Sequence, residues 1–222
     1  MLNFKHTHLS WNRPLGDYAK VQLLYSRLVR NKRFQLKNLP LKSYVNIGCG
    51  PNIDPDFINI DYQFRPKIDL CWDITKGIPL KNNSVKGVYT EHCLEHIEFS
   101  SCQFVIEEIY RILMPSGIAR IIVPDAELYL DIYEKKKKGE NIFFPYERNS
   151  SDYTPMMAVN RVFRGHEHKF AYDYETLKMM LHKAGFAEIK KEIYMSGKDV
   201  ELLADTKERK IESLYVEAIK KL

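Results

Sequence analysis

The feature that most constrains the fold is a series of short apolar segments, each closed by a glycine or an acidic residue. The segment 44–47 is followed by Gly48, 57–60 by Asp61 and 68–72 by Asp73. The segment 85–89 is followed, two residues on, by Glu91. Apolar residues at helical spacing follow over residues 103–113, and residues 118–123 are then almost wholly apolar. A strand without polar alternation is typical of the centre of a parallel sheet. Strands alternating with helices predict an open, mostly parallel sheet.

The rest of the chain completes this sheet. Asp173 is placed to cap a helix that ends at Gly185, and residues 188–195 and 213–219 are expected to form an antiparallel edge. Asp61 follows Gly50 by only 11 positions, which leaves too few residues for a crossover helix. We therefore predict an α/β, Rossmann-like, seven-stranded open sheet with helices on both faces and shortened early crossovers.

Composition and length set the class of protein. The chain has 222 residues, 45% hydrophobic and 28% charged, which excludes wholesale disorder and allows one well-buried domain. No apolar stretch reaches the length of a spanning helix. The four cysteines form no CxxC pair, which favours reduced thiols and a cytoplasmic protein.

Charge separates an N-terminal extension from the rest. Residues 1–42 hold nine Lys or Arg and one acid, so this segment carries +8 and the remainder −3. Apolar residues at helical spacing within residues 17–34 predict a helix packed on the main domain, with a membrane surface or a partner as the alternative. We expect domains at 1–42 and 43–222, with the polar stretch 140–170 as a lid or acceptor-site insertion. No nucleic-acid-binding motif is present, so nucleic acid is an unlikely substrate.

The polar strand ends outline a nucleoside site, because ligands of open α/β sheets bind beyond the carboxyl ends of the strands. Gly48 and Gly50 permit close backbone approach, Asp61 suits ribose hydroxyls, and Asp73 can accept from an adenine amine. The third glycine of a dinucleotide fingerprint is replaced by Ile53, and no phosphate-binding Lys-Ser/Thr pair follows. A nucleoside without phosphates fits, and S-adenosylmethionine is the common one.

Five short motifs in order resemble the class I S-adenosylmethionine-dependent methyltransferases. They are VNIGCG at 45–50, INID at 58–61, DI at 73–74 followed by IPL at 78–80, HCLEH at 92–96, and EIYRILMPSG at 108–117. The resemblance spans about residues 43–220 and is similar to a compact subgroup often associated with saccharide or cell-surface biosynthesis. It implies methyl transfer from S-adenosylmethionine to an O or N acceptor on a small molecule or saccharide.

The resemblance also implies roles for individual residues. Gly48 and Gly50 would line the methionine part, Asp61 the ribose, Asp73 and Ile74 the adenine, and Glu91 and His92 the transferable methyl. The full expected cofactor set is Asn46, Gly48, Cys49, Gly50, Asp61, Tyr62, Asp73, Ile74, Glu91 and His92. The family often has an acid where this chain has Asn46. No metal is expected.

A hydroxyl acceptor would need a general base, and the candidates are His92, His166, His168 and Asp125. Two other classes remain open. The string His92-x-x-Glu95-His96 fits a zinc-peptidase pattern, although it directly follows a strand rather than lying within a helix. A non-catalytic S-adenosylmethionine-binding module would bind the cofactor without turnover.

Overall fold

A seven-stranded sheet organises the computed structural model, which describes residues 17–31, 42–147 and 153–222. The strand order is β3-β2-β1-β4-β5-β7-β6. All neighbouring strands are parallel except at β7, which is antiparallel to both β5 and β6. The strands are β1 Tyr44–Ile47, β2 Phe57–Asp61, β3 Leu70–Cys71, β4 Val85–Glu91, β5 Leu113–Pro124, β6 Phe186–Glu192 and β7 Ser213–Lys220. The predicted fold class, with its antiparallel edge, is confirmed.

The early crossovers are short, as the residue count requires. β1 reaches β2 through a turn and an irregular loop, and β2 reaches β3 without a helix. After β3 comes a single 3₁₀ turn, η3 (Ile74–Lys76), capped by the Asp73 carboxylate. This half of the sheet therefore presents its strand ends with little chain covering them.

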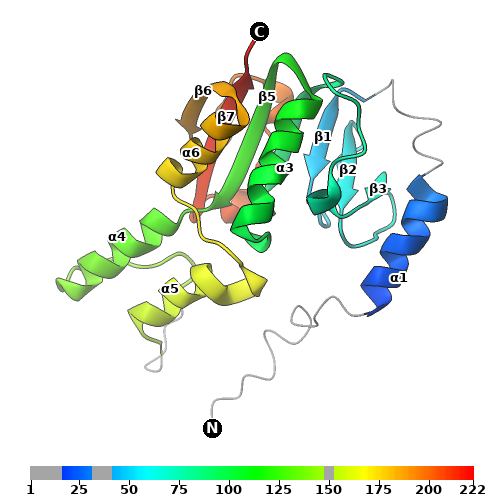
Figure 1. Ribbon diagram of the computed structural model, residues 1–222. Helices are drawn as coiled ribbons and strands as arrows, with labels where there is room; N and C mark the ends of the chain where they lie inside the picture. Colours follow the sequence, from blue (N-terminus) through cyan, green and yellow to red (C-terminus); the bar gives the residue numbers. More distant parts are fainter. Residues whose placement is uncertain (1–16, 32–41, 148–152) are drawn as a thin grey trace.

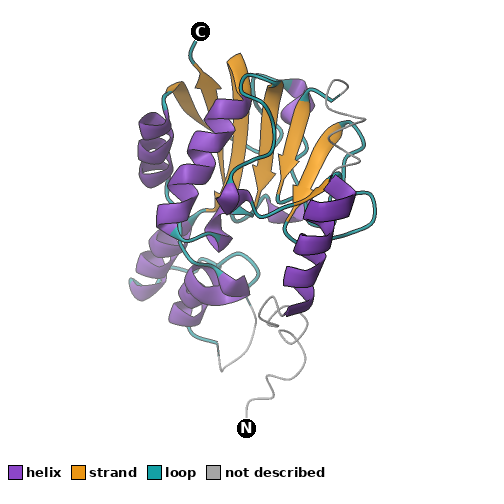
Figure 2. Cartoon of the chain, turned by 45° about the vertical axis from the view of Figure 1, so that its right-hand side comes forward, coloured by secondary structure: helices purple, strands orange, loops and turns teal. Residues whose placement is uncertain are grey.

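The two faces of the sheet are covered differently. Helices α3 (Phe99–Ile112) and α6 (Tyr174–Ala184) lie on one face, as Figures 1 and 2 show, and enclose the largest apolar core. The segment between β6 and β7 covers the other face. Its 3₁₀ turn η6 (Val200–Leu202) places Leu202 in a second apolar cluster with Phe57, Tyr89, Ile118, Ile122 and Tyr215.

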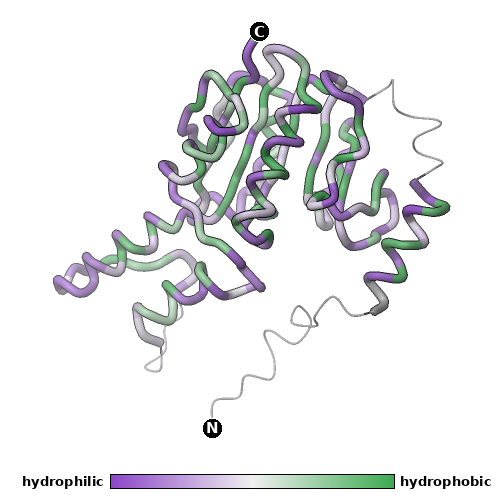
Figure 3. Tube along the Cα trace, viewed as in Figure 1, coloured by the Kyte–Doolittle hydropathy of each residue, from purple (hydrophilic) through white to green (hydrophobic). Residues whose placement is uncertain are grey.

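Two helices project beyond the carboxyl ends of the parallel strands. They are α4 (Ala126–Lys137), capped by Asp125, and α5 (Pro155–Arg164). Helix α5 lies within the polar stretch 140–170, for which the sequence predicted an insertion and no helix. Its buried Ala158, Val159 and Val162 pack with α4 in a third, small apolar cluster. Figure 3 shows the outer end of α4 as hydrophilic, in keeping with its solvated lysine run.

The N-terminal helix forms but packs differently from the prediction. Helix α1 (Asp17–Tyr25) continues into a π-helical turn, η2 (Ser26–Arg30), and residues 32–34 of the predicted helix lie outside the described residues. The predicted packing stripe is exposed: Val21, Leu24, Tyr25, Leu28 and Val29. The buried residues are instead Ser26 and Asn31, and the Asn31 amide donates to the Cys71 carbonyl. The hydrogen bond from Asn31 therefore attaches this helix to β3, and the apolar stripe does not contribute by burial.

None of the helices in the described ranges combines the length and the apolar character needed to cross a membrane.

Candidate functional site

The point where the strand order reverses lies at the carboxyl end of β1. From β1 the chain builds outward to β2 and β3 on one side, and then returns to β4 on the other. Ligands of open α/β sheets bind at such a point. The loops after β1, β2 and β4 meet here.

The glycine loop after β1 is held in a conformation that favours glycine. Gly48 and Gly50 have φ angles of +68° and +52°. A Cβ on Gly48 would lie 2.3 Å from the sulfur of Cys93, whereas a Cβ on Gly50 would meet no protein atom within 4 Å. Asn46 is buried and its amide donates to the carbonyl of Asn52, which stabilises the loop from inside. The chain after β4 is thus packed directly against the glycine loop.

Asp61 is the last residue of β2 and is fixed by backbone donors. Its Oδ2 accepts from the Gly50 N–H at 2.8 Å and its Oδ1 from the Gln63 N–H at 2.7 Å. Each carboxylate oxygen has a further lone pair. The residue is half-buried, so the side chain can accept additional hydrogen bonds from hydroxyl groups at this edge.

Asp73 follows β3 and has a structural role of its own. Its Oδ1 accepts from both the backbone N–H and the hydroxyl of Thr75 at 3.0 and 2.6 Å. Burial and, second, the charge of Asp73 raise the pKa of Tyr62. Ile74, the next residue along the chain, is buried. The structure thus places Tyr62 near Asp73, with Ile74 directly following.

Glu91, at the end of β4, is held by residues that the sequence did not single out. Its carboxylate accepts from the backbone N–H of Thr206 at 2.9 Å and from the Thr206 hydroxyl, and Arg209 lies 3.4 Å away. Thr206 and Arg209 come from the segment between β6 and β7. They lie 115 and 118 residues further along the chain, and no local pattern relates them to Glu91.

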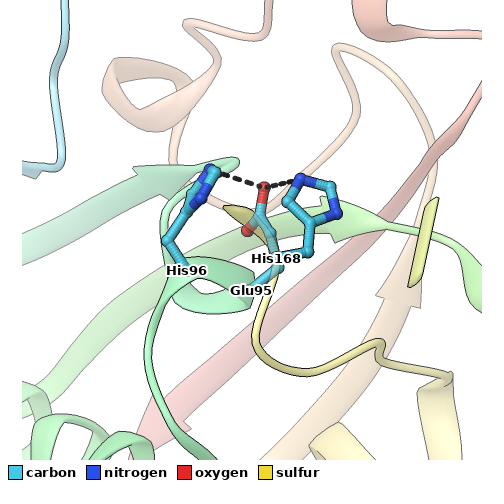
Figure 4. Close-up of side chains that lie close together, drawn as sticks. All are labelled: Glu95, His96 and His168. Atoms are coloured by element: carbon cyan, nitrogen blue, oxygen red, sulfur yellow. Dashed lines mark ion pairs between the residues drawn. The ribbon is translucent and has the colours of Figure 1, made fainter. Parts of the chain in front are cut away.

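Three histidines surround one buried carboxylate just beyond β4. The turn η4 (Leu94–His96) follows His92 and places the Glu95 side chain, 1% exposed, among them. Glu95 Oε1 lies 3.8 Å from His92 Nδ1, 3.7 Å from His96 Nε2 and 3.9 Å from His168 Nε2. Figure 4 shows this oxygen between the rings of His96 and His168. Neither Glu95 oxygen has a hydrogen-bond partner among the described residues.

Burial dominates the electrostatics of this histidine–glutamate cluster (His92, Glu95, His96 and His168). Burial, reinforced by Arg209 and the neighbouring imidazoles, lowers the pKa of His92 to about 2. Burial and the nearby histidines lower the pKa of His96 to about 4, and burial lowers the pKa of His168. Burial raises the pKa of Glu95 to about 8. The environment favours neutral imidazoles.

The other two candidates for a general base lie differently. His166 is exposed in turn η5 (Gly165–Glu167), with its ring centroid 5.9 Å from that of His168. Asp125 caps α4 by accepting from the Leu128 N–H, and its Oδ2 lies 3.8 Å from Lys191 Nζ. The structure thus brings His92 and His168 together, with His166 at the margin. Asp125 has the contacts of a helix cap.

Sequence comparison finds a known domain in the first part of the chain. The model of the methyltransferase domain family matches residues 38–121, which include β1 to β4, α3 and most of β5. No curated protein matches the chain at a significant level.

Solved structures with this fold include many methyltransferases. A S-adenosylmethionine-dependent methyltransferase from Archaeoglobus fulgidus is 17% identical, with a TM-score of 0.50 over 90% of this chain and 94% of its own. A Thermotoga maritima protein described as a possible histamine N-methyltransferase has a TM-score of 0.49 and 17% identity, over 92% and 95% of the two chains. The first likeness shows the fold.

The strand order, the glycine loop and acid at its switch point, and the family match agree with one another. Residues 38–121 therefore match the methyltransferase domain family, and the chain has the Rossmann-like fold of a solved S-adenosylmethionine-dependent methyltransferase.

Proposed function

We propose that residues 43–222 transfer the methyl group of S-adenosylmethionine to a hydroxyl group of a small polar molecule or saccharide. In this proposal the cofactor lies along the strand ends, on the ten residues that the sequence suggests. Asp61 accepts from the ribose hydroxyls, Asp73 and Ile74 flank the adenine, and Glu91 and His92 lie next to the methyl group.

The contact of Cys93 with Gly48 carries this proposal. Cys93 packs on the glycine loop, and His92 directly precedes it while Glu95 follows two residues later. The histidine–glutamate cluster therefore lies next to the proposed cofactor site. A sulfonium methyl group is already activated, so the enzyme mainly orients the acceptor and receives its proton. Amine acceptors can react without a base, whereas hydroxyl acceptors gain from one. Several imidazoles beside the site favour a hydroxyl.

The reaction is a displacement at the methyl carbon. The acceptor oxygen forms the new O–C bond, the S–C bond breaks with its electron pair going to sulfur, and S-adenosylhomocysteine leaves. The acceptor proton passes to a neutral imidazole. We assign this role first to His92, which directly follows β4, with His168 and His166 as further candidates.

We propose residues 140–170 as the acceptor side of the site. Helix α5 and turn η5 lie beyond the strand ends; η5 contains His166, and His168 directly follows it. Arg161 of α5 pairs with Glu212 at 2.6 Å, and the Tyr146 hydroxyl donates to the Glu208 carbonyl. Both contacts join this region to the segment that holds Glu91. The acceptor side is thereby connected to the cofactor edge.

The test is a turnover assay of the full chain with S-adenosylmethionine and a panel of saccharides, small alcohols and amines, read as S-adenosylhomocysteine formed. Turnover with hydroxyl acceptors, lost in His92→Gln but kept in the surface variant His182→Gln, is expected. Cofactor binding with no turnover on any acceptor would favour the non-catalytic alternative. Turnover on amines alone would overturn the hydroxyl assignment.

The exposed side of the N-terminal helix supports a separate proposal. Leu24 and Leu28 are each more than half exposed on a helix that also carries Arg27 and Arg30. We propose that this helix contacts an anionic membrane surface or protein partner. Leu24→Ser with Leu28→Ser should release the chain from anionic vesicles, and unchanged sedimentation with vesicles would contradict the membrane form. The free cysteines of the described ranges support a cytoplasmic location.

A further inference from the structure

Glu95 is a buried carboxylate without the donors that such a group needs. It is 1% exposed, yet neither oxygen accepts a hydrogen bond from any described residue. Its three imidazole neighbours lie 3.7–3.9 Å away, beyond the 2.7–3.2 Å of a hydrogen bond. Buried polar groups are almost always satisfied, so this side chain points to a partner of another kind.

The protonation of His168 is fixed by the protein. Its Nδ1 lies 2.7 Å from the Val162 carbonyl oxygen, which can only accept, so Nδ1 carries the proton. The neutral ring then presents the lone pair of Nε2 toward Glu95. Two backbone hydrogen bonds, from Lys169 and Phe170 to the Glu95 carbonyl at 2.7 and 3.2 Å, hold this segment against turn η4.

The same reasoning applies to His92. The hydroxyl of Ser213 donates its proton to the Arg209 carbonyl at 2.8 Å, so its oxygen must accept from His92 Nε2, also at 2.8 Å. The lone pair of His92 is therefore on Nδ1, 3.8 Å from Glu95 Oε1. At least two imidazole lone pairs thus face one carboxylate oxygen, an arrangement that a positive charge between them would stabilise.

The geometry fits a metal ion. One ligand atom each from Glu95, His96 and His168 can be chosen so that all lie within 4.8 Å of one another. Zinc bonds of about 2.0–2.2 Å at tetrahedral angles place ligand atoms roughly 3.3–3.6 Å apart. The distances of 3.7 and 3.9 Å from Glu95 Oε1 exceed this by a few tenths of an ångström, and the three ligand atoms lie within 4.8 Å of one another. Rotation of the partly exposed His96 ring would bring the set to ligand spacing.

The surroundings resemble those of metal ligands in other respects. The hydrogen bond from His168 Nδ1 to a backbone carbonyl is the arrangement by which proteins usually orient a ligating imidazole. The His96 side chain is 40% exposed, which gives an ion a path from solvent. Three protein ligands also leave one tetrahedral position open, as in catalytic rather than structural zinc sites.

We propose that Glu95, His96 and His168 bind one first-row divalent cation, of which Zn²⁺ is the best match to two imidazoles and a carboxylate. The site lies between turn η4 and the segment after α5, next to the proposed acceptor region. It joins two segments that are more than 70 residues apart in sequence.

The test uses the full chain after dialysis against a chelator. Titration with Zn²⁺, followed by calorimetry, should show one equivalent bound. Glu95→Gln, His96→Ala and His168→Ala should each weaken binding by more than the roughly 10–100-fold that loss of a supporting partner costs. His182→Ala, an exposed histidine on α6, is the matched control and should bind as the parent does.

Cobalt provides a second readout, because its visible spectrum reports the ligands. A Co²⁺ complex with nitrogen and oxygen ligands should lack the sulfur-to-metal band of a thiolate complex. Failure of Zn²⁺ and Co²⁺ to bind, equal binding by Glu95→Gln, or a thiolate band from Cys93 would each overturn the proposal. A proton would then be the partner of Glu95.

The cofactor site is measured separately in the same variants. Asp61→Ala should lose affinity for S-adenosylmethionine and keep Zn²⁺ binding, whereas Glu95→Gln should show the reverse. A failure of the metal proposal is thus distinguishable from a failure of the proposed methyl transfer.

Discussion

Two carboxylates lie near the strand ends of this sheet, and they differ in whether the protein supplies them with hydrogen bonds. Asp61 after β2 is half-buried, and each of its oxygens accepts a backbone N–H. Glu95 after β4 is fully buried, and neither of its oxygens accepts a hydrogen bond from the described residues. The backbone thus satisfies the hydrogen-bonding needs of Asp61. The Glu95 carboxylate needs donors, or a cation, that its neighbours do not supply.

The difference arises from where the donors come from. Backbone N–H groups of residues 50 and 63 are fixed by the turns that start and end at Asp61. The imidazoles around Glu95 come from separate segments, and two of them have already donated their proton to Val162 and Ser213.

The largest expected effect comes from the residue where the two regions meet. Gly48→Ala would place a Cβ 2.3 Å from Cys93 Sγ at a φ of +68°. Overpacking and left-handed strain should together cost about 2–5 kcal/mol of unfolding free energy. Gly139→Ala, at a φ of +88° with no atom within 4 Å, should cost only about 1–2 kcal/mol. Urea denaturation of both variants measures the difference, and equal losses would show that the contact with Cys93 is unimportant.

The next effect concerns cofactor affinity. Asp61→Ala should weaken S-adenosylmethionine binding by about 1–3 kcal/mol, because ribose hydroxyls and the Gly50 N–H would lose their acceptor. Asp56→Ala changes an exposed acid in the loop just before β2 and should leave affinity unchanged. Calorimetric titration decides, and similar affinity in both variants would remove Asp61 from the site.

A smaller loss of stability is expected in the region around Glu95, without a change in cofactor affinity. Arg161→Ala removes the ion pair with Glu212 and should lower the free energy of unfolding by about 1–2 kcal/mol. Hydrogen exchange at residues 166–168 should increase while S-adenosylmethionine affinity stays the same. Lys138→Ala breaks only an exposed pair with Glu134 and should change neither. A loss of cofactor affinity in Arg161→Ala would mean that the two regions are coupled.

The smallest effect is expected from Glu95→Gln in metal-free protein. A glutamine amide can donate to the imidazole lone pairs, so the free energy of unfolding should stay the same or rise. Asp61→Asn should instead lower it by about 1 kcal/mol, because an NH₂ group would face a backbone N–H. Thermal and urea denaturation of the pair would contradict this if Glu95→Gln lost as much stability as Asp61→Asn.

The sequence predicts the sheet and its strand ends better than the segments that lie beyond them, for physical reasons. Short apolar segments closed by Gly48, Asp61 and Asp73 are local signals, and the predicted sheet, its antiparallel edge and the cap at Asp173 are confirmed. Helix α5 was missed because its apolar residues face a small cluster rather than the main core. The N-terminal helix was given the wrong buried face because helical spacing predicts a stripe and not what covers it.

The histidine–glutamate cluster could not be predicted from local sequence patterns. The string at 92–96 and the histidines at 166 and 168 were both noted, but no pattern relates segments that distant. In the fold, the hydrogen bonds from Lys169 and Phe170 to the Glu95 carbonyl and the ring contact of His96 with His168 bring the two segments together. For Asp125, the sequence suggested a base and the structure shows the contacts of a helix cap.

The hydrogen bonds from Thr206 and the ion pair with Arg209 that fix Glu91 have a consequence for the order of folding. The family match ends at residue 121, yet the last strand end of the cofactor edge is fixed by residues more than 80 positions later. Contacts so distant in sequence form late and slowly. During synthesis, a growing chain that already contains every recognisable motif still lacks the groups that fasten Glu91. If the proposed site is correct, the chain can therefore hold S-adenosylmethionine only after the C-terminal third has been synthesised and has packed against Glu91.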